Sequence, residues 1–302
     1  MRSHIAQLAH GPVRYLDNGH GKLLLLLHGF PLNAEQWLPQ VSRPPVGFRV
    51  IAPDLRGFRG AGSPLSVAQS ERAVASEPAA RSADRGVPAS DAVGAPAGVK
   101  PPGQITIDDY AADALALMSH LDIDRAIVGG LSMGGYVALA IARRAPARLT
   151  GLILANTRAG ADSVEGRAAR DRMIDLVRRE GVHAVARDML PKLLGHTTER
   201  DQPDLIEAVR GLIEANDADG LEAAIHAMKT RPDSTPMLAS IAYPTLVITS
   251  AEDALINVSE GEAMARVIPH SQLVVLPNAG HLSNLESPDE FSRALQLARE
   301  WT

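Results

Sequence analysis

The feature that most constrains the fold is a short turn between an apolar segment and a helix-forming segment. Residues 125–129 (RAIVG) indicate a buried strand, and residues 136–144 (YVALAIARR) indicate a helix that ends before Pro146. Between them lie residues 130–135, with the sequence GLSMGG. A serine at so sharp a turn cannot adopt ordinary backbone angles, and this strain costs about 1–3 kcal/mol. We therefore predict that the turn presents Ser132 at the end of a strand, in front of a helix N-terminus.

Two glycines support this prediction. Gly130 and Gly134 lie two residues on either side of Ser132, where a Cβ atom would crowd the turn. The Gly-x-Ser-x-Gly pattern also occurs in ordinary glycine-rich turns. A catalytic role for Ser132 therefore depends on partners elsewhere in the chain.

Composition restricts the class of protein. The 302 residues can form one large domain or two small ones, and a hydrophobic content of 45% excludes disorder throughout. The formal net charge of −5 argues against nucleic acid as a main partner. The chain has no cysteine, which excludes disulfides, a thiol nucleophile and thiolate metal ligands.

The N-terminal region has no run resembling a signal peptide, and its longest apolar run, residues 23–27, is too short to span a bilayer. We expect a cytoplasmic protein that does not bind a membrane. The histidines show no metal-ligand spacing, so we also expect no metal.

Apolar strands alternate with helical segments along most of the chain, which predicts a parallel sheet covered on both faces. Thr106 and Asn33 are suitable helix N-caps. The expected strands are residues 5–8, 13–16, 23–27, 48–52, 125–129, 149–155, 244–249 and 272–276, the first two forming a hairpin. The expected helices within this pattern are residues 33–41, 107–121, 136–144, 259–267 and 288–301.

Two segments depart from the alternation. Residues 60–103 are rich in Ala, Ser, Gly and Pro, and we interpret them as a surface insertion. A tolerated low-complexity insertion is favoured there over a lid or a partner-binding arm. Residues 160–238 contain only helical patterns and would form a cap over a core made of residues 1–159 and 239–302. The cap helices are expected at residues 168–180, 182–194, 204–216 and 219–229.

A serine nucleophile needs a base within hydrogen-bond reach and a carboxylate that orients the base. Such groups should lie at the carboxyl ends of parallel strands. Asp253 follows the strand at residues 244–249, and His281 follows the strand at residues 272–276. Asp162, which follows an earlier strand, is the weaker candidate for the acid. His28, Asp54 and Arg56 are interpreted as residues that organise their loops, Asp54 and Arg56 through a local ion pair.

Five motifs in this order resemble the α/β-hydrolase superfamily over nearly the whole chain except the insertion. They are residues 28–31 (HGFP), 54–57 (DLRG), 130–135 (GLSMGG), 252–253 (ED) and 279–281 (AGH) with 286–288 (ESP). The resemblance implies a mostly parallel eight-stranded sheet with helices on both faces and a small helical cap. It also implies a triad of Ser132, His281 and Asp253, and an oxyanion hole made of the backbone N–H groups of Phe30 and Met133.

Within that superfamily the chain is similar to carboxylesterases, aryl esterases and 3-oxoadipate enol-lactonases. We expect hydrolysis of small or medium esters or lactones through an acyl-enzyme, by a monomer or homodimer that needs no cofactor. C–C hydrolases, proline-releasing aminopeptidases and perhydrolases use the same triad and remain alternatives. A ligand-sensing receptor, or a scaffold whose insertion is the working part, would keep the fold without turnover.

Overall fold

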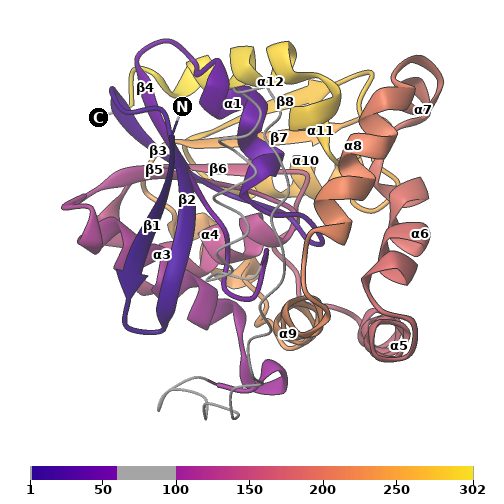
Figure 1. Ribbon diagram of the computed structural model, residues 1–302. Helices are drawn as coiled ribbons and strands as arrows, with labels where there is room; N and C mark the ends of the chain where they lie inside the picture. Colours follow the sequence, from indigo (N-terminus) through magenta and orange to yellow (C-terminus); the bar gives the residue numbers. More distant parts are fainter. Residues whose placement is uncertain (1, 60–99, 302) are drawn as a thin grey trace, which may run out of the picture.

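The computed structural model describes residues 2–59 and 100–301 (Figure 1). The predicted insertion at residues 60–103 therefore lies outside the described residues, apart from its last four positions. Of these, residues 102 and 103 begin a short 3₁₀ helix, η2 (Pro102–Gln104).

An eight-stranded sheet forms the centre of the molecule, as predicted. The strands are β1 (Arg2–Leu8), β2 (Gly11–Asp17), β3 (Lys22–Leu27), β4 (Phe48–Pro53), β5 (Ala126–Leu131), β6 (Leu149–Ala155), β7 (Thr245–Ser250) and β8 (Ser271–Leu276). Their spatial order is β1-β2-β4-β3-β5-β6-β7-β8. The pairs β1–β2 and β2–β4 are antiparallel and all the others are parallel. The carboxyl ends of the central strands consequently meet at one edge of the sheet.

Apolar side chains explain why the central strands are buried on both faces. Residues 24–27 in β3 are at most 2% exposed, and all six residues of β5 are buried. In Figure 1, helices α3 (Ile107–His120) and α4 (Met133–Arg144) cover one face, and α1 (Leu38–Ser42) and α12 (Pro288–Leu295) cover the other. Helix α10 (Val258–Val267) packs against β7 and β8.

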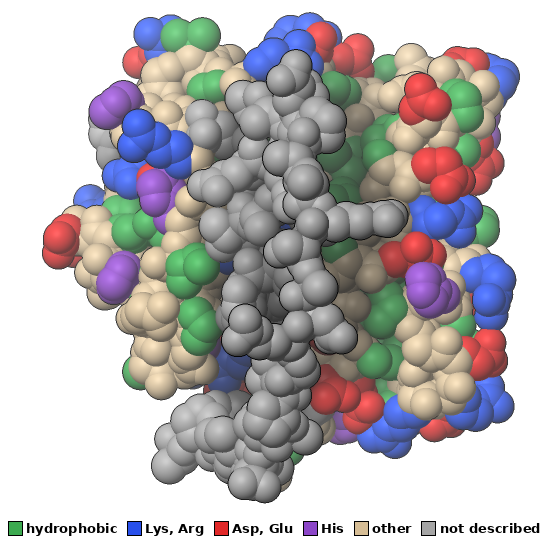
Figure 2. Space-filling model, in the orientation of Figure 1, with side chains coloured by type: hydrophobic (Ala, Val, Ile, Leu, Met, Phe, Trp, Pro, Cys, Tyr) green, Lys and Arg blue, Asp and Glu red, His purple; other side chains and the backbone are tan. Residues whose placement is uncertain are grey.

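A group of helices separates β6 from β7 and leaves the sheet at the carboxyl end of β6 (Figure 1). Its members are α5 (Val164–Glu180), α6 (Val182–Leu193), α7 (His196–Asp201), α8 (Pro203–Glu214) and α9 (Ala218–Lys229). Figure 2 shows acidic and basic side chains interspersed over part of this group. We call these five helices the helical segment.

Several helices differ from the prediction. Helix α5 starts at Val164 rather than 168, because Ser163 caps it by accepting a hydrogen bond from Gly166. Helix α7, and α11 (Ser283–Glu286) after the β8 loop, were not predicted, since six and four residues are too few for a visible periodicity. The predicted helix at 288–301 ends at Leu295 and continues as the 3₁₀ helix η5 (Gln296–Ala298).

A further difference lies at residues 33–41, where a 3₁₀ helix, η1 (Ala34–Trp37), precedes α1. Both predicted caps are confirmed. Asn33 accepts a hydrogen bond from the amide of Glu35, and Thr106 forms a reciprocal capping box with Asp109. Among the described residues, no helix is long and apolar enough to cross a bilayer.

Candidate active site

The predicted strained turn is present between β5 and α4. Ser132 has φ 54° and ψ −114°, a left-handed conformation that non-glycine residues rarely adopt. A Cβ atom on Gly130 would lie 2.0 Å from the carbonyl oxygen of Gly134, and one on Gly134 would lie 2.1 Å from that of Leu27. Only glycine fits at these two positions, so the sequence around the serine is set by the close approach of backbone to backbone.

His281 and Asp253 meet at the carboxyl ends of β8 and β7. The Nδ1 atom of His281 lies 3.0 Å from Oδ1 and 2.9 Å from Oδ2 of Asp253. Both side chains are shielded, at no more than 1% exposure. Burial alone would raise the pKa of Asp253, but His281 and hydrogen bonds from Ile256 and Asn156 hold the pKa below its usual value. Asp253 is therefore suited to remain a carboxylate and to fix the ring of His281.

Asn156, at the carboxyl end of β6, is a further part of this arrangement. Its Nδ2 donates to Oδ2 of Asp253 at 2.9 Å and to Oγ of Ser250 at 2.5 Å, and its Oδ1 accepts from Oγ of Ser283 at 2.6 Å. The residue also has a positive φ of 43°. The sequence prediction missed it, although a polar side chain in the loop at the carboxyl end of a strand is the signal that identified Asp253.

Glu286 joins the His281 loop to the helical segment. Its carboxylate accepts hydrogen bonds from the amides of Gly280 at 2.9 Å and Leu282 at 3.0 Å, which flank His281. It also accepts from the amide of Gly195 at 2.7 Å and from Oγ1 of Thr198 at 2.8 Å. Burial raises the pKa of Glu286 even though these hydrogen bonds oppose the shift.

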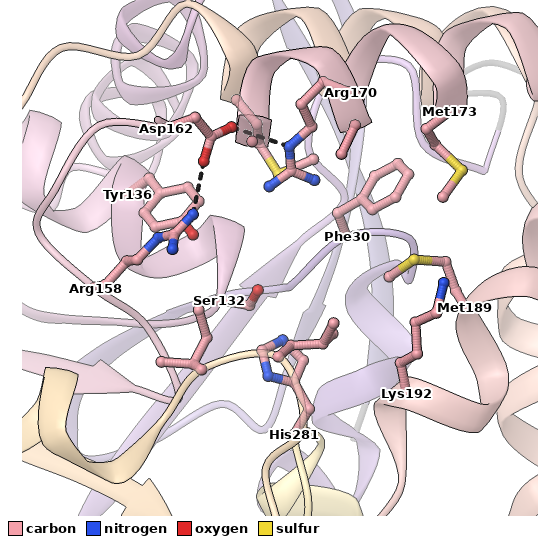
Figure 3. A pocket seen from close by; sticks show the side chains of 15 residues that line it. Phe30, Ser132, Tyr136, Arg158, Asp162, Arg170, Met173, Met189, Lys192 and His281 are labelled. Carbon is pink, nitrogen blue, oxygen red and sulfur yellow. Dashed lines mark hydrogen bonds and ion pairs between the residues drawn. The ribbon is translucent and has the colours of Figure 1, made fainter. Parts of the chain in front are cut away.

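A cavity of about 260 Å³ opens beside Ser132 and His281 (Figure 3). Part of its wall comes from residues of the helical segment, on α5, α6 and α9. The lining residues are Phe30, Ser132, Tyr136, Arg158, Asp162, Gly166, Ala169, Arg170, Met173, Met189, Lys192, Met228, Leu255, Ile256 and His281. Ser132 and His281 therefore share one cavity, and Asp253 lies behind His281.

The loop after β3 packs against the turn that carries Ser132. A Cβ atom on Gly29 would lie 3.2 Å from the carbonyl oxygen of Leu131 and 3.4 Å from Cβ of Ser132. The next residue, Phe30, lines the cavity. Within residues 2–59 and 100–301, no hydrogen bond uses the backbone N–H of Phe30 or Met133. Met133 is the first residue of α4, so its N–H has no partner inside the helix.

His28 is part of the loop structure, as the sequence indicated. Its Nε2 accepts a hydrogen bond from the amide of Leu55 at 3.0 Å, and its Nδ1 lies 3.1 Å from the carbonyl oxygen of Gly29. Complete burial lowers the pKa of His28 from 6.5 to about 4. The ring is therefore neutral near pH 7 and connects two loops.

The predicted ion pair between Asp54 and Arg56 is wrong in its pairing. Asp54 pairs with Arg14, at 2.6 Å from its Nε, and also accepts from the amide of Ala34. Arg56 pairs with Asp113 of α3, its Nε lying 2.8 Å from Oδ2. Each side chain thus links its loop to a distant element, which spacing along the sequence cannot indicate.

Asp162 does not hydrogen-bond to His281. Its carboxylate lies 2.7 Å from Nη2 of Arg158, 3.1 Å from Nε of Arg170 and 2.8 Å from Nη1 of Arg231. The structure therefore places this alternative acid in an arginine cluster on the cavity wall, which the sequence prediction missed. The clustered arginines come from three separate segments, so no local motif marks them.

Comparison with known proteins identifies the family. The family model of the alpha/beta hydrolase fold matches residues 22–288. The 3-oxoadipate enol-lactonase 2 of Acinetobacter baylyi is 32% identical over 196 residues, which cover 65% of this chain and 72% of the relative.

Two solved structures are similar over nearly their whole length. A malate-bound thermophilic esterase from Thermogutta terrifontis is 36% identical with a TM-score of 0.82, and the match covers 100% of both chains. The enol-lactonase from Burkholderia xenovorans LB400 is 26% identical with a TM-score of 0.77, and the match covers 97% of this chain and 98% of the enzyme. The eight-stranded sheet and the extent of the family match lead to one conclusion: the chain belongs to the alpha/beta hydrolase fold family.

Proposed function

We propose that this protein is a serine hydrolase that cleaves carboxylic esters or lactones through an acyl-enzyme. The observation that carries the proposal is the strained Ser132, which shares a cavity with a histidine paired to a buried carboxylate. The relatives named as enol-lactonases and as an esterase support the choice of ester and lactone bonds.

In the first half of the proposed reaction, Oγ of Ser132 attacks the carbonyl carbon while Nε2 of His281 takes the hydroxyl proton. The carbonyl oxygen becomes an oxyanion, which the N–H groups of Phe30 and Met133 would stabilise. A donor of this kind is typically worth about 10²–10³ in rate. As the intermediate collapses, the carbon–oxygen bond of the ester breaks and His281 returns the proton to the leaving alkoxide. With a lactone, the new hydroxyl stays attached to the acyl group.

In the second half, water attacks the acyl-serine and His281 takes one of its protons. Collapse of this second intermediate releases the carboxylic acid, and His281 returns the proton to Ser132. Asp253 stabilises the imidazolium form of His281 in both halves and holds its Nδ1 proton. The sum is hydrolysis of one ester bond by one water molecule.

We also infer that residues 160–238 act as a cap that selects the substrate. Helices α5, α6 and α9 contribute Met173, Met189 and Met228 to the cavity. These side chains are flexible and apolar, and they can adapt to a short acyl chain. A cavity of about 260 Å³ favours a small substrate over a long lipid.

A series of p-nitrophenyl esters from C2 to C12 tests the proposal, with wild type and Ser132→Ala measured in parallel. We expect release of p-nitrophenolate from the short esters, and a loss of at least about 10³-fold in the variant. A folded wild type that turns over none of the esters would contradict the proposal. Tight retention of a ligand without turnover would favour the receptor alternative.

A further inference from the structure

One wall of the cavity carries an excess of positive charge. Arg158, Arg170 and Arg231 all pair with the carboxylate of Asp162, whose side chain is only 1% exposed. Glu260 on α10 adds a smaller electrostatic contribution at Arg158. Three guanidinium groups thus share one close carboxylate, in a chain whose formal net charge is −5.

Arg231 has a structural role in this cluster. Its side chain is 3% exposed, and its guanidinium lies over the ring of Tyr136, 4.1 Å from the centroid. It also donates to the carbonyl oxygens of Gly160 and Met228, both at 2.8 Å. These contacts connect the end of α9 to the loop after β6 and leave Arg231 away from the cavity surface.

Arg158 and Arg170 differ from Arg231 because both line the cavity. Their side chains are 29% and 24% exposed, and Figure 3 shows them on either side of Asp162, across the cavity from His281. Within residues 2–59 and 100–301, hydrogen bonds engage only Nη2 of Arg158 and Nε of Arg170. A guanidinium has five N–H groups, so most of those on each side chain are available to another acceptor.

Two other basic side chains of the helical segment pair with carboxylates away from this cluster. Lys192 lines the opposite wall, but its Nζ lies 2.7 Å from the carboxylate of Asp188 one helical turn away. On the outside of the helical segment, Arg187 pairs with Glu180. On the cavity wall the positive charge is concentrated at Arg158 and Arg170, and Nε of Arg158 is buried without an acceptor among the described residues.

On the basis of the proposed hydrolase function, we propose that Arg158 and Arg170 form a carboxylate-binding subsite. The ester or lactone cleaved at Ser132 would then carry a second, unesterified carboxylate on a short chain. Two guanidinium groups held by one buried aspartate offer forked N–H donors that match a carboxylate. The apolar side chains of Phe30 and Met173, which also line the cavity, suit the methylene groups between the two ends of such a substrate.

Two p-nitrophenyl esters of equal size test this subsite. One is the p-nitrophenyl hemiester of adipic acid, and the other carries a neutral carboxamide in place of its free carboxylate. We expect wild type to prefer the hemiester in kcat/KM by at least about tenfold. Arg158→Gln and Arg170→Gln should each reduce that preference toward unity, and the ratio cancels effects common to both substrates.

Arg167→Gln is the matched control. Arg167 lies on the same helix as Arg170 and donates to the backbone carbonyl of Asp162, but it does not line the cavity. This variant loses the same charge and should keep the preference for the hemiester. Equal use of both substrates by wild type, or an equal loss of preference in all three variants, would overturn the subsite and leave the hydrolase function intact.

A binding measurement separates the subsite from the proposed function. Ser132→Ala is titrated calorimetrically with monomethyl adipate and with its carboxamide analogue. We expect the monomethyl adipate to bind at least about tenfold more tightly, and addition of Arg170→Gln to remove the difference. This result would support the subsite even if wild type hydrolysed no ester. Equal affinity for the two compounds would contradict it.

Discussion

At the scale of single residues, the site depends on side chains and glycines whose conformations are fixed by their neighbours. Ser132 keeps its left-handed backbone because Gly130 and Gly134 let the strand, the turn and α4 approach closely. The sequence could predict this strain, since both causes lie within five residues. It could not predict Asn156 or the arginine cluster, because their partners come from distant segments.

A pH titration of stability tests the buried state of His28. The folded-state pKa is about 4, below the ordinary 6.5, so the unfolded chain binds a proton between these values while the folded chain does not. The contribution of the neutral, buried His28 ring to the free energy of unfolding is complete above pH 6.5 and is lost as the pH falls toward 4. As the pH falls from 7 to 4.5, the difference in free energy of unfolding between wild type and His28→Gln should therefore shrink by about 2–3 kcal/mol. Urea unfolding of both proteins gives this difference, and parallel pH curves would refute a buried neutral ring.

At the scale of elements, the helical segment is attached to the core by a few close contacts. Strands with continuous apolar runs were predictable, as were helices with caps at Asn33 and Thr106. The short helices α7 and α11 were not, since tertiary contacts rather than propensity hold them. Glu286 at the end of α11 bonds to Thr198 in α7, so each short helix stabilises the other.

The contact between α9 and the loop after β4 yields a prediction. A Cβ atom on Gly220 would lie 1.6 Å from the carbonyl oxygen of Gly57, which itself has φ +84°. Gly220→Ala should lower the free energy of unfolding by about 1–3 kcal/mol, although alanine favours helix by nearly 1 kcal/mol. Gly211→Ala in α8 is the matched control, because no described residue has an atom within 4 Å of its Cβ position. Gly211→Ala should raise the free energy of unfolding by about 0.5–1 kcal/mol. Equal effects in chemical denaturation would contradict the close contact.

Removal of the Glu286 carboxylate should destabilise the His281 loop. Glu286→Ala leaves four buried donors without their acceptor, and we expect a loss of at least about 3 kcal/mol. Glu286→Gln keeps one acceptor oxygen and should lose less of the free energy of unfolding than Glu286→Ala.

The same variant gives a prediction on pH. Because burial raises the pKa of Glu286, its ionisation opposes folding. The difference in free energy of unfolding between wild type and Glu286→Gln should therefore narrow as the pH rises above 4.5. A gap that widens over that range would contradict the raised pKa.

At the scale of the whole molecule, the alternation of strands and helices predicts the α/β fold class, although a long low-complexity stretch lies within it, whereas the spatial order of the strands was not predicted because it depends on pairings between distant segments. The ends of that stretch lie along one helix. The amide of Arg59 donates to Asn216 just before α9, and Gly103 lies against His226 within α9. Ten helical residues rise about 15 Å, so a short connection can join the two ends.

Replacement of residues 60–99 by a Gly/Ser linker tests whether the core needs them. A linker of about 12 residues has an r.m.s. span of roughly 19 Å, enough for the gap. We expect the thermal unfolding midpoint to stay within a few degrees of wild type, and the kcat/KM for p-nitrophenyl butyrate to stay within about threefold. A folded variant without hydrolysis would favour the interpretation in which the insertion is the working part.

The most direct test of the central claim is covalent labelling with a fluorophosphonate, followed by peptide mapping. Only an activated serine reacts quickly with such a probe, because the reaction needs the same base and oxyanion donors as acylation. We predict a single adduct on the peptide that contains Ser132, and no adduct in Ser132→Ala. A folded wild type that stays unlabelled, or a label that persists in Ser132→Ala, would contradict the assignment of Ser132 as the nucleophile.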